Sequence, residues 1–230
     1  MIIVIIRIIV LIISVMLHEL AHGFTAYLFG DDTAKQAGRL TLNPLKHLDP
    51  FGSIFLPMIL AVTKSPVMFG WAKPVPINMS KIKNSKQNVA IISVAGPLVN
   101  IILVIVGVIG LHFLRATILA KYGQDVYKVY FMISETAKLQ LISADFFVFV
   151  GLEFLIQFVF INTALAVFNL VPIPPLDGSR LLYPLLGQRQ EQIFASLEKY
   201  GILIIFLLLY FHVLDPIFNF VFKILLKLIL

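Results

Sequence analysis

The chain carries a five-residue motif, His18-Glu19-Leu20-Ala21-His22, in which three residues separate two histidines. On an α-helix, residues four apart lie on one face, so the two imidazoles converge on one point. A glutamate beside the first histidine is the general base in zinc peptidases with this H-E-x-x-H pattern. We therefore expect His18 and His22 to bind a metal ion and Glu19 to activate water.

The motif lies in a run that is long and apolar enough to cross a membrane. Residues 1–30 are apolar except for Arg7 and the motif itself, and about 20 apolar residues span the core of a bilayer. Ionisable side chains at that depth are costly and indicate function. Two histidines on one helix face can also act only as hydrogen-bonding partners of neighbouring helices. We favour metal binding, because each ionisable group in such a run must find a partner.

The composition indicates an integral membrane protein. Hydrophobic residues make up 60% of the 230 residues, and the mean hydropathy is +0.98. We expect no cleaved signal peptide, since a basic n-region and a small-residue cleavage site are missing and cleavage would remove the motif. The net charge of +6 lies in loops, so we expect no nucleic-acid partner. The chain has no cysteine, so any metal must be held by histidine, carboxylate and water.

The apolar stretches predict the fold class. Four are long enough to be spans: residues 2–29, 88–114, 146–168 and 201–222. A fifth, 51–71, is shorter and is interrupted by Pro57, and the last span is broken at Asp215-Pro216. A short strand-like run, 38–42, lies in a polar loop. We predict an all-α membrane protein, a polytopic transmembrane helix bundle with a re-entrant or interfacial segment and a short strand-like membrane-proximal hairpin.

A third metal ligand has to be found, because hydrolytic zinc sites generally have three protein ligands and one open position. Asp177 is the best candidate among few carboxylates. It follows Pro172, Pro174 and Pro175, which stiffen an extended turn, and it precedes Gly178, which permits unusual backbone angles. The same residues also fit an ordinary turn before a helix, so the local sequence leaves both interpretations open.

Two motifs together resemble the site-2 protease family of intramembrane metalloproteases. They are H-E-L-A-H in the first span and N-L-V-P-I-P-P-L-D-G at 169–178. Three more segments agree with that family: G-R-L-T-L-N-P at 38–44, G-W-A-K-P-V-P at 70–76 and A-G-P-L-V-N at 95–100. The pair of motifs is far more specific than H-E-x-x-H alone.

The resemblance implies a zinc site and its chemistry. The implied Zn²⁺ ligands are His18, His22 and Asp177. Glu19 would activate water, Asn169 would steady the oxyanion, and Asn100 would support the site. The resemblance covers about residues 14–182, so we expect one integral membrane metalloprotease domain over 1–230, with an accessory membrane segment at about 200–230. Many relatives carry a PDZ domain between spans, but no loop here is long enough for one.

The ligand set constrains the topology. His18 and His22 lie late in the first span, and Asp177 follows the span 146–168, so these two spans must run in the same direction. The span 88–114 is one crossing, and the stretch 51–71 must therefore return to its own side. Irregular backbone at that depth is tolerated where protein or a water-filled cavity covers it.

The distribution of basic residues predicts the orientation of the chain in the membrane. With this topology, residues 30–88 share one face, which carries eight basic residues against three aspartates. Basic loops mark the cytoplasmic side. We therefore expect a multi-pass protein of the cell membrane whose active site lies toward the cytoplasmic leaflet.

The expected function is intramembrane zinc metalloproteolysis, the hydrolysis of a peptide bond in or near the transmembrane segment of a membrane protein. The expected partners are the lipid bilayer and a single-span membrane-protein substrate, whose identity the sequence does not give, and the oligomeric state is unknown. The alternative is a membrane zinc transporter or sensor without proteolytic activity. That alternative would use the same ligands but has no need of Glu19.

Overall fold

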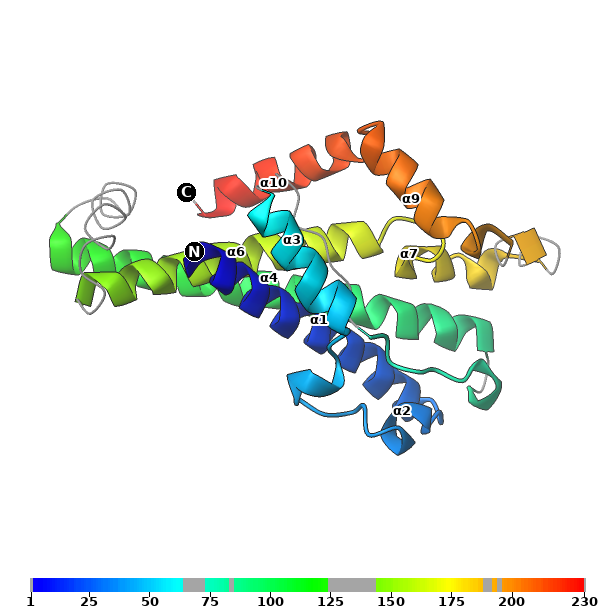
Figure 1. Ribbon diagram of the computed structural model, residues 1–230. Coiled ribbons are helices and arrows are strands. Elements are labelled where there is room, and N and C mark those ends of the chain that lie inside the picture. Colours follow the sequence, from blue (N-terminus) through cyan, green and yellow to red (C-terminus); the bar gives the residue numbers. More distant parts are fainter. Residues whose placement is uncertain are drawn as a thin grey trace.

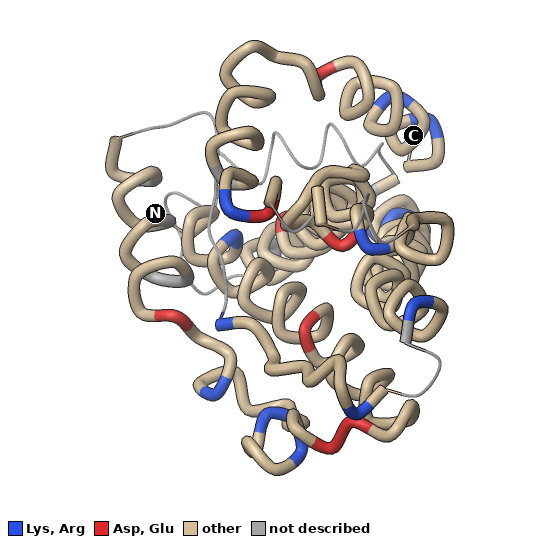
Figure 2. Tube along the Cα trace, turned by 90° about the vertical axis from the view of Figure 1, so that its right-hand side faces the viewer, with Lys and Arg blue, Asp and Glu red and all other residues tan. Residues whose placement is uncertain are grey.

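Three long helices form the centre of the computed structural model, which describes residues 2–63, 73–82, 85–123, 144–187, 192–193 and 196–229. Each is long and apolar enough to cross a membrane, and each packs against the other two (Figure 1). They are α1 (Ile2–Leu28), α4 (Ser85–Tyr122) and α6 (Ala144–Asn169). Most of the trace in Figure 2 is tan, because these helices carry few charges. The chain is an all-α, multi-pass membrane protein, as predicted.

Helices α1 and α6 run in the same direction, as the ligand set requires. Arg7 Nε donates to Gln157 Oε1 at 3.1 Å, and one level further along both helices Asn162 Nδ2 donates to Ser14 Oγ at 2.9 Å. Residue numbers in the two helices therefore rise together. Both helices run from left to right in Figure 1 and cross at an angle, with their C-terminal ends on the same side of the bundle.

Helix α4 runs antiparallel to α1 and is longer than predicted. The α1 residues His18 and His22 contact Asn100 and Ile92, so the numbers fall in α4 as they rise in α1. The sequence predicted that this span ends near residue 114, but the helix continues to Tyr122. It continues because Ile118, which is 1% exposed, is part of the core between α4 and α6.

The C-terminal membrane segment is broken, as its Asp215-Pro216 pair suggested. It forms α9 (Gly201–Tyr210) and α10 (Asp215–Ile229), which meet at 69°. Leu225 of α10 is buried in the same core as Phe149 and Leu152 of α6, so α10 folds back on the bundle. Figure 1 shows α10 lying along α6 and α9 turning toward α7 (Asp177–Arg180).

The stretch between α1 and α4 returns to the end of α1 from which it departs. It contains a π-helical turn, η2 (Pro50–Phe55), and α3 (Leu56–Val62). Helix α3 has 7 residues, about 10 Å, which is too short to cross a bilayer. Residues 64–72 lie outside the described residues. The chain at 73–78 then lies beside the C-terminal half of α1, where Val75 N donates to Glu19 Oε2 and Asn78 N donates to Asp31 Oδ2.

The prediction of a strand-like hairpin at 38–42 was wrong. Residues 37–42 form turns and bends, and no strand occurs in the part of the chain that the structure describes. The neighbouring segment, 73–78, is extended, but Pro74 and Pro76 have no N–H to donate to a strand ladder. Arg39 Nη2 instead donates to the carbonyl oxygens of Lys73 and Pro74. A side chain thus makes the contacts that a second strand would have made.

The fold predicts that the parts of the α1–α4 connection before η2 and after α3 face the same side of the membrane. We expect Lys46→Cys and Ser80→Cys, both at exposed positions, to react with a membrane-impermeant thiol reagent from the same side. Lys121→Cys, at the other end of α4, should react only from the opposite side. The chain has no native cysteine, so each variant has a single reactive thiol. Reaction at positions 46 and 80 from opposite sides would contradict the topology.

Candidate metal centre

The two histidines of the motif lie on the face of α1 that packs into the bundle. His18 is 5% exposed and His22 is 6% exposed, and both belong to the helix Ile2–Leu28. Their Nε2 atoms are 3.0 Å apart. The spacing of four residues therefore brings the two rings to one point, as the sequence predicted.

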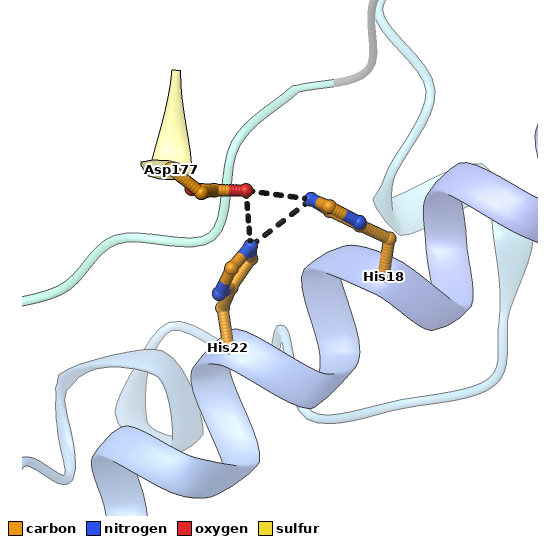
Figure 3. A group of neighbouring side chains, drawn as sticks. All are labelled: His18, His22 and Asp177. Carbon is orange, nitrogen blue, oxygen red and sulfur yellow. Dashed lines mark hydrogen bonds and ion pairs between the residues drawn. The ribbon is translucent and has the colours of Figure 1, made fainter. Parts of the chain in front are cut away.

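Asp177 completes the cluster from the other end of the chain. Its Oδ2 lies 3.1 Å from Nε2 of His18 and 3.1 Å from Nε2 of His22. Figure 3 shows the three side chains converging, with the histidines on one helix and the aspartate on a separate segment. Among the described residues, these three form the one group of histidine and carboxylate side chains with metal-ligand spacing.

Each histidine is oriented by a hydrogen bond on its far nitrogen. His22 Nδ1 donates to the main-chain oxygen of Ile92 at 2.7 Å, and His18 Nδ1 donates to Asn100 Oδ1 at 2.6 Å. Both acceptors belong to α4. A proton on Nδ1 leaves Nε2 of a neutral imidazole with its lone pair. Metal-binding histidines are oriented in this way in general.

The donor set fits a metal ion. Two Nε2 lone pairs and one carboxylate oxygen face one another within 3.1 Å in a largely buried site. Three acceptors at this distance repel one another unless a proton or a cation lies among them. Two imidazoles and one carboxylate are ligands that zinc accepts, and three protein ligands leave a fourth position open. His18, His22 and Asp177 would hold the ion.

Gly96 lets α4 approach the two rings. A Cβ atom at this position would lie 2.6 Å from Cε1 and 2.7 Å from Nε2 of His18, and it would also clash with His22 Nε2. Any other residue here would push the imidazoles out of place. The residue lies in the A-G-P-L-V-N segment at 95–100, and nothing in that local sequence predicts its contact with the two rings.

Two glycines allow close packing around the turn that carries Asp177. A Cβ on Gly178 would lie 2.6 Å from the carbonyl oxygen of Val171, and a Cβ on Gly201 would lie 2.8 Å from Pro175 N. The first glycine lets the start of α7 lie on the end of α6. The second lets the start of α9 lie on the proline-rich turn.

An apolar cluster supports the same turn from behind. Val171 and Leu176, which bracket the prolines, are buried together with Leu214 from the bend between α9 and α10. Further apolar side chains pack around this cluster: Phe168, Ile173, Ile205, Leu208 and Phe218. The C-terminal membrane segment therefore contributes directly to the position of the Asp177 carboxylate.

Glu19 is held beside the cluster by the connection between α1 and α4. Its Oε2 accepts a hydrogen bond from Val75 N at 2.8 Å. Val75 lies between Pro74 and Pro76, so it has the one main-chain N–H of this Pro-Val-Pro run. The glutamate is not part of the group of three side chains that could hold a metal ion, in line with a role other than metal binding.

Asp31 anchors the segment that carries Val75. It is fully buried, and its carboxylate accepts from Asn78 N at 2.6 Å, from Thr33 N at 3.0 Å and from Thr33 Oγ1. Burial alone would raise the pKa of the Asp31 carboxyl group. These hydrogen bonds lower the pKa by more than burial raises it, so it lies below its ordinary value. The carboxylate is therefore charged at neutral pH and ties the extended segment to the end of α1.

Asn169 lies at the end of α6 and its side chain bonds within its own helix. Its Nδ2 donates to the carbonyl oxygen of Leu165 at 3.0 Å. An oxyanion role requires this amide to turn toward the substrate, and that role stays a prediction.

Asn100, expected as a supporting residue, contacts His18 directly. Sequence reasoning missed Ser14 and Asn162, which lie behind Asn100 and which no local motif marks.

The fold and the cluster define a class: a multi-pass membrane protein with a His₂Asp metal centre inside its helix bundle. The family model for peptidase family M50 matches residues 6–212. The chain belongs to this family, the site-2 protease family, and is a membrane zinc metalloprotease. No solved structure matches it.

Curated relatives agree with this assignment. "Putative zinc metalloprotease YwhC" of Bacillus subtilis is 37% identical over 218 residues, covering 92% of this chain and 85% of its own. "Putative zinc metalloprotease Rip2" of Mycolicibacterium smegmatis is 30% identical over 198 residues, covering 86% of this chain. Rip2 of Mycobacterium tuberculosis is 29% identical over 208 residues, or 90% of this chain. The chain spans 64% and 66% of the lengths of these two Rip2 proteins.

The cluster predicts that zinc binding depends on the Asp177 carboxylate. Asp177→Asn keeps the shape of the side chain but removes its charge, so zinc should no longer bind stoichiometrically. Metal analysis of protein purified in detergent measures this, with Asp32→Asn as the control on the exposed face of the loop after α1. One zinc per chain in both variants would show that Asp177 is not a ligand.

Gly96→Ala should weaken zinc binding strongly, by about 10-fold or more, because the added methyl group displaces both imidazoles. Gly151→Ala in α6 is the matched control, since a Cβ there meets Leu114 Cδ2 at an ordinary 3.9 Å. Competition with a chelator gives the affinity of each variant. Equal affinities for the two variants would mean that the close approach of α4 has no bearing on the site.

Proposed function

We propose that the chain hydrolyses a peptide bond in or near the transmembrane segment of a membrane-protein substrate. The observation that carries this proposal is the position of the cluster. Two of the proposed ligands come from inside a membrane-spanning helix, and the third reaches them from α7, which follows the turn after a second spanning helix. A peptide bond has to enter the bundle to meet such a site.

The metal and the protein have separate tasks in this hydrolysis. When bound, zinc supplies Lewis acidity, which polarises the scissile carbonyl and acidifies the attacking water. His18, His22 and Asp177 would fix the position of the zinc ion. Their orientation is set in advance by Asn100, by the Ile92 carbonyl and by the proline-rich turn. Preorganised ligands of this kind save the cost of reorganisation during the reaction.

Glu19 is the proposed general base. It directly follows His18 in the chain, and the hydrogen bond from Val75 N holds one carboxylate oxygen, Oε2. Oε1 is then assigned to accept the proton of the attacking water and to pass it to the nitrogen of the leaving amine. General acid–base catalysis of this kind contributes about 10²–10⁴-fold. Asn169 is proposed to donate its amide to the oxyanion once it has left Leu165.

The bilayer adds two requirements to this mechanism. A transmembrane substrate has its main chain hydrogen-bonded within its own helix, so it must unwind before a peptide bond can be attacked. Water must also reach the cluster. The irregular connection between α1 and α4, which lies beside Glu19, is the proposed source of both the polar path and the contacts to the unwound substrate.

The proposed orientation places the cluster toward the cytoplasmic leaflet of the cell membrane. Eight basic residues against three aspartates in residues 30–88 support it through the positive-inside rule. In the labelling experiment described above, positions 46 and 80 should accordingly be closed to an impermeant reagent on intact cells and open in inverted vesicles.

Glu19→Gln should abolish proteolysis while zinc stays bound, since glutamine keeps the shape but cannot accept the proton. The substrate is found by co-expressing the chain with a library of tagged single-span membrane proteins, and its cleavage is then measured after reconstitution. Residual activity should be 10²-fold or more below wild type. Zinc content is measured in parallel.

Two controls complete this experiment. Glu198→Gln makes the same chemical change at an exposed position and should leave cleavage unchanged. The alternative function, zinc transport or sensing, makes a different prediction, because it has no use for a base beside the ligands. Cleavage of the library by neither the wild type nor the variant, together with zinc uptake by both, would favour that alternative and reject the protease mechanism.

A further inference from the structure

Behind His18 lies a chain of buried polar side chains that joins all three long helices. We propose that Asn162 is a positioning residue for the metal centre. Acting through Asn100, it fixes the ring of His18 with a proton on Nδ1 and a lone pair on Nε2. The inference rests on the proposed role of His18 as a ligand, and it assigns a function to a residue of α6 that contacts no ligand itself.

The contacts form a continuous path. His18 Nδ1 bonds Asn100 Oδ1 at 2.6 Å, and Asn100 Nδ2 donates to Asn162 Oδ1 at 2.8 Å. Asn162 Nδ2 donates to Ser14 Oγ at 2.9 Å and to the carbonyl oxygen of Phe158 at 2.8 Å. Ser14, Asn100 and Asn162 are each 0% exposed, so protein groups and not solvent determine their orientation.

The hydrogen bonds of this path all have a fixed donor and acceptor, and the Phe158 carbonyl at the end farthest from His18 determines them. The Phe158 carbonyl can only accept a hydrogen bond, so the Asn162 side chain must point its NH₂ group toward it. Asn162 Oδ1 then faces Asn100 and requires a donor there. Asn100 in turn must present its NH₂ group to Asn162 and its Oδ1 to His18.

This polarity decides the chemistry of the metal ligand. A carboxamide oxygen facing Nδ1 of His18 can only accept, so the proton of the ring belongs on Nδ1. If the Asn100 side chain turned over, its NH₂ group would face Nδ1 and favour the other tautomer, with a proton on Nε2. That tautomer has no lone pair for a metal. Asn162 prevents the turn, because its Oδ1 would then meet another oxygen.

The network could instead only hold the helices together, and one neighbouring residue separates the two roles. Thr163 follows Asn162 on α6, is also buried, and bonds its own helix in the same way, from Oγ1 to the Val159 carbonyl at 2.8 Å. It has no hydrogen bond to Asn100. Removal of Thr163 Oγ1 therefore reports only on packing in this part of α6. Removal of the Asn162 side chain reports both on packing and on the relay, by which we mean the hydrogen bonds from Asn162 through Asn100 to His18.

The first test uses the wild-type protein. ¹⁵N-histidine NMR on metal-depleted protein in detergent should show a proton on Nδ1 of His18, with its signal identified through a His18→Gln variant. In Asn162→Leu, the signal should shift toward a mixture of tautomers. Wild-type protein with an unprotonated Nδ1 would overturn the proposal, and this outcome does not depend on whether any relay variant folds.

The second test measures zinc affinity by chelator competition. Asn162→Leu should bind zinc about 10-fold more weakly, the usual effect of removing a group that orients a ligand. Thr163→Val should be unchanged.

The outcomes distinguish the relay from the metal-site assignment. Wild-type affinity in Asn162→Leu, or an equal loss in Thr163→Val, would reject the relay while leaving the ligands in place. Stoichiometric zinc that persists after His18→Gln would reject the assignment of His18 itself. Size-exclusion chromatography in detergent before each titration ensures that only folded protein is compared.

Discussion

Three atoms that each carry a lone pair, two imidazole nitrogens and one carboxylate oxygen, lie within 3.1 Å of one another in a site with little access to water. Such an arrangement is unfavourable unless a positive charge lies among the atoms, and leaving one buried polar group unsatisfied typically costs about 1–3 kcal/mol. The protein must therefore hold these groups against their own repulsion whenever no cation is bound. Most of the features around the cluster serve this purpose.

Each ligand is held by a different part of the bundle. Helix α4 orients both imidazoles through acceptors and comes close enough to do so because position 96 has no side chain. Asp177 depends on a stiff turn that rests on the end of α6 and on the start of α9. The broken C-terminal segment, which the sequence suggested was only an accessory, is thus part of the frame of the site.

The sequence predicted the features that depend on local spacing or on chain direction. The four-residue interval of the histidines placed them on one helix face, and the need for Asp177 to reach them fixed α1 and α6 as parallel. The sequence did not predict the partners of isolated polar residues. Ser14 and Asn162 lie in apolar helices without a periodic pattern, and their partners come from other helices. The strand prediction at 38–42 failed because the adjacent segment contains Pro74 and Pro76, which cannot donate to a ladder.

The separation of the ligands along the chain has a consequence for biogenesis. His18 and Asp177 are 159 residues apart, and the turn that carries Asp177 rests on α9, which is synthesised later still. A ribosome that has inserted α1, α4 and α6 has therefore not yet produced a complete centre. The nascent chain passes through the membrane-insertion machinery with its two histidines but without the third ligand in place. The metal centre is therefore completed only after most of the chain has been synthesised.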